Sequence, residues 1–145
     1  MSKIILIFSA LILLLTILSG CSTDTREAWE KIEVRESRTC VVYECEDEEE
    51  PASLEITPSK RGATGTEIEG NFHLKGDYWI IEFDTRMLQP GKIDEEIFLR
   101  ACVFTITFKD NTVGKYNVGI NDYKKSYKGG HIIHLPPTAI TATEN

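Results

Sequence analysis

The stretch Cys102-Val-Phe-Thr-Ile-Thr-Phe108 decides the fold, because large apolar side chains alternate in it with Val and Thr. A period of two places alternate residues on opposite faces of a β-strand, so this stretch predicts a strand with one buried face. Asp110-Asn111 follows, and both residue types tolerate the positive φ of a tight turn. Tyr116, Val118 and Ile120 then alternate again, which completes a predicted hairpin.

The same alternation recurs elsewhere in the chain. Lys75-Gly76-Asp77 is a tight-turn sequence between two alternating stretches, residues 67–75 and 78–83, and it predicts a second hairpin. Residues 93–100 depart from the pattern: Asp94-Glu95-Glu96 there either opens a helical turn or belongs to a loop that leads into the next strand. Further short strands are predicted at residues 39–45, 53–57 and 131–135.

Seven or eight short strands, two hairpins and almost no helix predict an all-β fold. We expect a small antiparallel β-sandwich, because the apolar faces are one-sided; a closed β-barrel is the alternative. The predicted organisation is a signal peptide at 1–20, a tether or short helix at 21–37, one β-domain at 38–136 and a flexible tail at 137–145.

The first twenty residues form an apolar leader in which Lys3 is the single charged residue. The apolar run from Ile4 to Leu18 spans roughly 22 Å as a helix, which is shorter than the roughly 30 Å hydrocarbon core of a bilayer. This layout is typical of a signal peptide. Leu18-Ser19-Gly20-Cys21, at the end of the run, resembles the lipobox of bacterial lipoproteins. An ordinary cleaved signal or an uncleaved anchor is the alternative.

This resemblance implies that Cys21 is lipidated and becomes the first residue of the mature protein. Two or three acyl chains, palmitate among them, would then hold the protein on a membrane. The implied location is the cell envelope. In a Gram-negative host it is the outer membrane, facing the periplasm, and in a Gram-positive host it is the outer face of the plasma membrane.

Charge excludes two classes of partner. The full sequence has a net charge of −7, and the chain without Lys3 has a net charge of −8. Binding to nucleic acid requires clustered Lys and Arg to neutralise phosphates, and the acidic balance argues against it. The chain also lacks the polybasic stretch that electrostatic docking onto anionic lipid requires.

Three cysteines besides Cys21 would lie in an oxidising compartment. Cys40 and Cys45 are too far apart on one extended strand to bond, at roughly 16 Å against the roughly 7 Å limit between Cα atoms. The sequence therefore predicts one disulfide that joins Cys102 to either Cys40 or Cys45. Three buried free thiols are the alternative.

Other polar groups give no catalytic or metal-binding pattern. The acidic run at residues 44–50 has no glycine to shape a calcium loop, so a solvated loop is expected. His131 and His134 are three residues apart and fall on opposite faces of a strand, which predicts two surface histidines and no shared metal; the same surface reading holds for His73. No nucleophile elbow or phosphate loop is present, so we expect no cofactor and no enzyme activity.

One Tyr-rich and locally basic stretch stands out on an acidic protein and is the predicted binding surface. Tyrosine and lysine together offer stacking and charge to a carbohydrate or an anionic partner. The alternative is a loop that its lysines keep soluble. The predicted surface consists of Tyr116, Tyr123, Lys124, Lys125, Tyr127 and Lys128.

These patterns predict a membrane-anchored envelope lipoprotein with a non-catalytic β-domain that binds a protein or an envelope polymer. One alternative rests on a resemblance. Tyr43-Glu44-Cys45, the acidic linker and the alternating strand at Leu54 resemble the start of the membrane-bound lysozyme inhibitor domain, which implies a small β-barrel on a lipoprotein anchor. The Ser-Gly-x-x-Tyr inhibitory loop of that family is missing from the sequence. A small extracytoplasmic enzyme is the second alternative.

Overall fold

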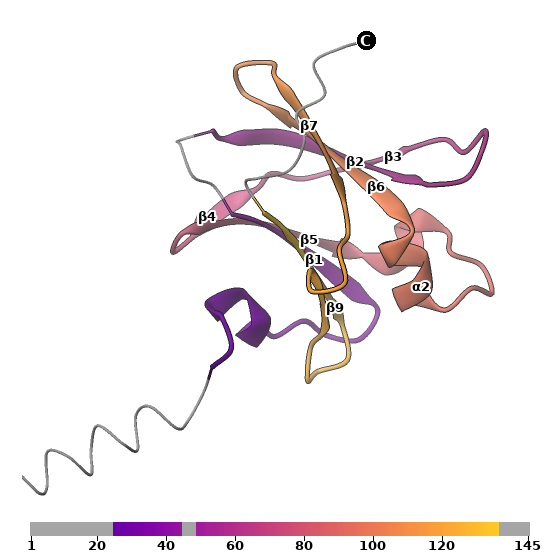
Figure 1. The fold of residues 1–145 in the computed structure, drawn as a ribbon, viewed down its shortest axis with the longest axis horizontal. Helices are drawn as coiled ribbons and strands as arrows, with labels where there is room; N and C mark the ends of the chain where they lie inside the picture. Colours follow the sequence, from indigo (N-terminus) through magenta and orange to yellow (C-terminus); the bar gives the residue numbers. More distant parts are fainter. Residues whose placement is uncertain (1–24, 45–48, 137–145) are drawn as a thin grey trace, which may run out of the picture.

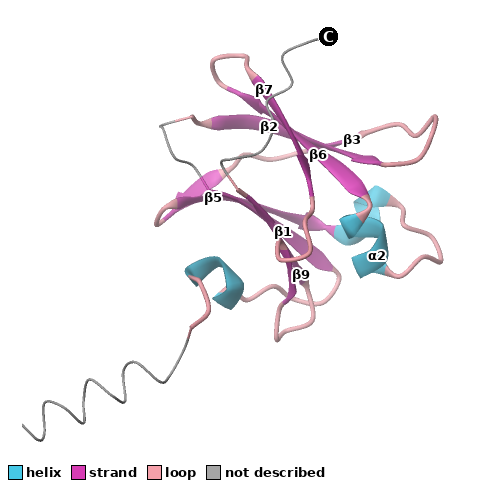
Figure 2. Ribbon diagram, in the orientation of Figure 1, coloured by secondary structure: helices cyan, strands magenta, loops and turns pink. Residues whose placement is uncertain are grey.

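The computed structural model describes residues 25–44 and 49–136, which fold into two facing β-sheets (Figure 1). The predicted signal peptide, Cys21, Cys45 and the predicted tail lie outside these ranges. The strand order is β4-β5-β1-β9-β8 in the first sheet and β3-β2-β6-β7 in the second. The strands are β1 (Arg38–Glu44), β2 (Pro51–Pro58), β3 (Thr66–Ile68), β4 (His73–Lys75), β5 (Tyr78–Asp84), β6 (Cys102–Phe108), β7 (Val113–Asn117), β8 (Tyr123–Lys125) and β9 (His131–Leu135). The helical elements are η1 (Ala28–Lys31), η2 (Thr85–Leu88) and α2 (Glu95–Arg100) (Figure 2).

The two sheets pack face to face around one hydrophobic core, which confirms the predicted sandwich. Val41 and Ile133 contribute to this core from the first sheet, and Leu54, Phe104 and Ile106 contribute from the second; all five are fully buried. Both sheets are open: β4 and β8 lie at the edges of the first, and β3 and β7 at the edges of the second. The alternative of a closed barrel is therefore wrong for the described residues.

Both predicted hairpins are present. Lys75 pairs with Tyr78 across a two-residue turn in which Gly76 has a φ of 62°, a backbone conformation that favours glycine. In the hairpin between β6 and β7, the Phe108 N–H donates to the Thr112 carbonyl at 2.9 Å. The turn chemistry thus fixes both connections as the sequence indicates.

The predicted single strand at residues 67–75 is wrong, because the chain changes sheets inside it. Residues 66–68 form β3 in the second sheet, whereas residues 73–75 form β4 in the first. Between them Gly70 has a φ of 118°, which glycine adopts without steric cost and which turns the chain out of an extended path. Ile68 is consequently buried in the core, while Leu74 is 57% exposed.

The central strand β1 has a neighbour that the all-antiparallel prediction missed. It pairs with β5 antiparallel, from Arg38 with Asp84 to Glu44 with Tyr78. On its other side it pairs with β9 in parallel, so the last strand of the described chain lies beside the first. Every residue from Thr39 to Tyr43 is buried, as expected of a strand that is covered on both faces.

A second, smaller core covers the outer face of the first sheet. Trp29 from η1 and Val34 pack there against Cys40, Val42 and Ile132. The short helix predicted within residues 21–37 is present, but it packs on the domain, so the β-domain begins before residue 38 (Figure 1). In the described part of the chain, no helix is long and apolar enough to cross a membrane.

The structure corrects the prediction of a Cys40–Cys102 disulfide. Both residues are buried free thiols. Cys40 belongs to the outer core, whereas Cys102 belongs to the core between the sheets. They therefore lie on opposite sides of the first sheet and cannot meet. The alternative partner, Cys45, lies outside the described residues.

Burial makes both thiols poor nucleophiles. It raises the pKa of Cys40 to about 12 and that of Cys102 to about 11, because a thiolate is disfavoured away from water. The Cys102 thiol also donates to the Phe98 carbonyl oxygen at 3.2 Å. We expect neither cysteine to react with a maleimide at neutral pH while the protein is folded, because the thiolate is the reactive form.

Peptide mapping of the detergent-solubilised full chain tests this expectation. Without reductant, Cys40 and Cys102 should remain unlabelled in the native protein and become labelled in denaturant. Labelling of Cys102 that required prior reduction would contradict the free thiol and support the predicted disulfide with Cys45.

Candidate functional site

The predicted Tyr-rich binding surface does not form one surface. Tyr116 is only 5% exposed and lies in the core between the sheets, where its ring meets Tyr43 edge-on at 6.0 Å. It pairs with Phe104 in the β6–β7 ladder, so it shares the inward face of that strand. Tyr123 is half-buried, while Tyr127 is 76% exposed.

The lysines of the predicted surface are exposed, but two of them contact the N-terminal segment. Lys124 forms an ion pair with Glu30 at 3.3 Å, and Lys128 forms one with Glu33 at 2.9 Å. The Lys128 ammonium also lies 5.8 Å from the centre of the Tyr127 ring. Exposed ion pairs of this kind are screened by water and contribute little to stability. Their position indicates that they help to hold the N-terminal segment on the sheet.

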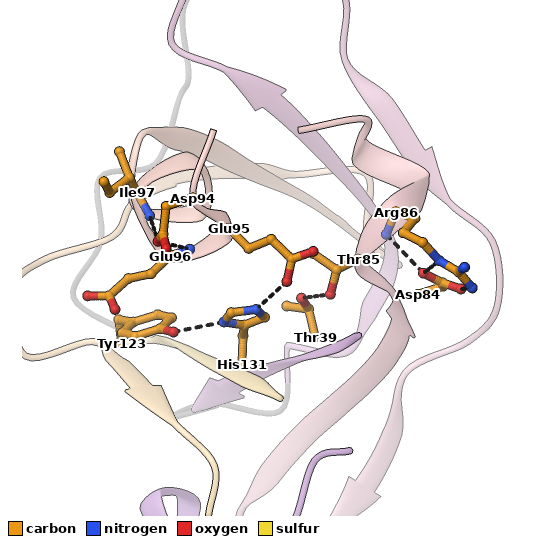
Figure 3. A network of polar contacts seen from close by, with 10 residues as sticks. All are labelled: Thr39, Asp84, Thr85, Arg86, Asp94, Glu95, Glu96, Ile97, Tyr123 and His131. Carbon is orange, nitrogen blue, oxygen red and sulfur yellow. Dashed lines mark hydrogen bonds and ion pairs between the residues drawn. The ribbon is translucent and has the colours of Figure 1, made fainter. Parts of the chain in front are cut away.

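His131 is buried, so the prediction of a surface histidine is wrong. Its Nδ1 lies 2.7 Å from the Tyr123 hydroxyl, and its Nε2 lies 2.9 Å from Glu95 Oε1 (Figure 3). Burial, followed by the nearby acidic side chains, raises the pKa of Tyr123 to about 12. The Tyr123 hydroxyl and His131 Nδ1 share one hydrogen bond, and Nε2 shares the other with the Glu95 carboxylate, which is an acceptor. This network joins α2 to β8 and β9.

His134 is also buried, and on the opposite face of β9, as its spacing predicts. Its ring stacks on Trp29 with centroids 4.6 Å apart and planes 5° apart. Its Nε2 lies 2.8 Å from Glu44 Oε1, and its Nδ1 lies 3.2 Å from Asp122 Oδ1. Both contacts place a carboxylate oxygen, which is a hydrogen-bond acceptor, beside a ring nitrogen of His134. The cluster attaches η1 to the sheet.

The sequence misses both buried histidines because β9 is covered on its two faces. All five residues of β9 are buried. The core between the sheets and α2 cover one face, and the N-terminal segment covers the other. The described residues contain no group of three or more His, Cys, Asp or Glu that could hold a metal ion.

The helical alternative for residues 93–100 is confirmed, and two caps stabilise this end of the sandwich. Asp94 caps α2 by accepting from the backbone N–H groups of Glu96 and Ile97 (Figure 3). Asp84 caps η2 in the same way through the Arg86 N–H. Burial of Leu88 and Leu99 in the core fixes both elements on the sheets.

A groove of about 680 Å³ lies at this end of the sandwich. Its walls come from the end of β2, the loop between β2 and β3, η2 and α2. The volume falls within the roughly 300–1,000 Å³ of typical ligand sites. The residues of the groove that carry the argument below are Ile56, Lys60, Arg61, Leu88, Ile93 and Phe98.

Three exposed apolar residues either line this groove, as Ile93 does, or precede a lining residue in the chain, as Met87 precedes Leu88 and Ile97 precedes Phe98. Ile97 is 64% exposed, Ile93 is 54% exposed and Met87 is 40% exposed. Sequence reasoning did not single out these residues or the neighbouring cations. Ile93 precedes the Asp94 cap and Ile97 lies in the first turn of α2, so apolar residues on both sides of a predicted helix start are the signal that could have found them.

Comparisons of the chain with protein-family models, with curated proteins and with solved structures find no match. The fold and the groove together define a small β-sandwich domain with a preformed hollow at one end. The function therefore has to be inferred from the geometry of this chain.

The Tyr123–His131–Glu95 network predicts a specific stability effect. Removal of the hydroxyl in Tyr123→Phe leaves buried His131 Nδ1 without its hydrogen-bond partner, which should cost about 1–2 kcal/mol of unfolding free energy. Tyr127→Phe is the matched control, since Tyr127 is exposed and its change should stay within about 0.5 kcal/mol. Denaturant unfolding of the detergent-solubilised chain, followed by tryptophan fluorescence, measures both. Equal effects of the two variants would show that the network does not stabilise the fold.

Proposed function

We propose that the chain is a lipid-anchored lipoprotein of the bacterial envelope, and that its non-catalytic β-sandwich binds a protein partner. The sequence Leu18-Ser19-Gly20-Cys21 supports the anchor. The groove, with exposed Ile93, Ile97 and Met87 beside it, carries the binding function. Apolar side chains gathered around a hollow are typical of a surface that another molecule covers.

The position of the N-terminal segment is compatible with this anchor. Ala28 begins η1 only seven residues after Cys21, which is at most roughly 25 Å of extended chain. The proposed lipid would therefore hold the sandwich close to the membrane. The acidic balance of the domain, at a net charge of −8 without Lys3, would keep it from adhering to anionic lipid.

The anchor has a direct test. The full chain, expressed in a bacterium that processes lipoproteins, should enter the detergent phase and carry acyl groups on Cys21 by mass spectrometry. Cys21→Ser should abolish both, because the thioether cannot form. Cys45→Ser is the matched control and should remain acylated. A Cys21→Ser protein that was still acylated would overturn the proposed anchor.

The binding function has a separate test in the same cells. A photo-crosslinking amino acid at Ile97, the exposed neighbour of the groove residue Phe98, should form a discrete covalent adduct with a second protein. The same amino acid at Lys115, an exposed residue of β7, should not. Mass spectrometry identifies the adduct and separates a lysozyme from other partners. No adduct from Ile97, or the same adduct from both positions, would contradict the proposal.

A further inference from the structure

We infer that the groove beside α2 takes a protein segment that carries acidic and large apolar side chains. This inference rests on the proposed binding function and names the chemistry of the partner. It depends on three features: an apolar floor, two cations that form no ion pair with any described residue, and exposed apolar side chains next to lining residues in the chain.

The floor of the groove is apolar and belongs to the core. Ile56 from β2 and Leu88 from η2 are almost completely buried, and Phe98 from α2 packs on the same core. A large apolar side chain that entered the groove would contact these residues. Burial of such a side chain removes apolar surface from water, which favours binding.

The cations of the groove come from an ordered turn. The Ala63 N–H donates to the Lys60 carbonyl at 2.9 Å, with Gly62 at a φ of 79°. A hydrogen bond across four residues with a positive φ at the third is typical of a type II turn. The turn is also tied to the end of α2, because the Ser59 N–H donates to the Ala101 carbonyl at 2.9 Å.

Charge complementarity selects an acidic occupant. Neither Lys60 nor Arg61 forms an ion pair with another described residue, whereas Lys109, Lys124 and Lys128 each pair with a glutamate. On a chain with a net charge of −7, two unpaired cations beside an apolar floor are a local reversal of sign. Carboxylates of a partner would pair with them, and like charges would be repelled.

The exposed apolar side chains favour a protein over a small ligand. Ile97 and Met87 lie outside the hollow itself, so a molecule confined to the groove would leave them in water. A protein segment that filled the groove and continued over α2 would cover them. Methionine, arginine and aromatic residues are also enriched in protein interfaces, and Met87, Arg61 and Phe98 supply all three here.

The groove is preformed, which lowers the cost of binding. Glu95 attaches α2 to His131, the Asp84 and Asp94 caps fix the two helical ends, and Thr85 hydrogen-bonds Thr39 at 2.7 Å in the interior (Figure 3). A partner would therefore meet side chains that are already in place and would not pay to order these elements.

Selection from a displayed library of random peptides tests the inference, with the detergent-solubilised full chain as bait. Enriched peptides should combine Asp or Glu with Leu, Ile, Phe or Met. Fluorescence anisotropy should show at least about tenfold weaker binding to Lys60→Glu/Arg61→Glu and to Ile97→Ser. Lys115→Glu/Lys125→Glu is the matched control. This control makes the same change of charge on two exposed lysines outside the groove. Lys125 also belongs to the predicted Tyr-rich surface. The control variant should bind the peptides as tightly as the wild type does.

Each other outcome would overturn the inference. Enriched peptides without acids, or peptides that bind the groove variants as well as the wild type, would place binding elsewhere while leaving the proposed binding function intact. If no peptide is enriched, the groove does not bind a peptide segment and the inference is wrong. The proposed binding function would then be tested only by the crosslinking at Ile97. Binding to vesicles of anionic phospholipid that Lys60→Glu/Arg61→Glu abolished, with no peptide bound, would identify a lipid surface as the partner instead.

Discussion

The structure depends on the burial of β1 on both of its faces. One face of this strand lies in the core between the two sheets, through Val41 and Tyr43, and the other lies in the outer core, through Cys40 and Val42. A strand in this position needs neighbours on both edges and cover on both sides. The β5 and β9 ladders supply the neighbours, and the second sheet and the N-terminal segment supply the cover.

Most of the fold follows from local patterns in the sequence. The alternation from Cys102 to Phe108 predicts β6 and its buried face, and Gly76 predicts the turn of one hairpin. The boundaries that were wrong depend on contacts between distant parts of the chain. In the sequence, Gly70 fits the alternation of a single strand, and only the pairing of its two flanks with different sheets shows that the chain turns there. The parallel pairing of β9 with β1 has no local signal in the sequence.

The candidate site was harder to predict, for the same reason. β9 carries one histidine on each face, and a histidine within a strand indicates solvent exposure unless distant segments cover it, so the burial of His131 and His134 has no local signal. Two patterns in the sequence conflict at Tyr116. Its basic neighbours favour a surface position, whereas its alternation with Val118 favours the core, where the structure places it. The groove itself joins segments that are far apart in the sequence, such as the turn at Lys60 and α2.

The packing of the N-terminal segment has a mechanical consequence. If Cys21 holds the protein on a membrane, a force that pulls the domain away reaches the described part of the chain at its N-terminal end, where η1 packs on the sheet. The Trp29–His134 stack meets this load first. The next points of resistance are the Gly130 N–H, which donates to the Val34 carbonyl at 2.9 Å, and the close fit of Gly130 against the Val34 backbone. Unfolding under such a load would then begin by peeling this segment from β9, while the covalent chain would keep the protein attached to its lipid.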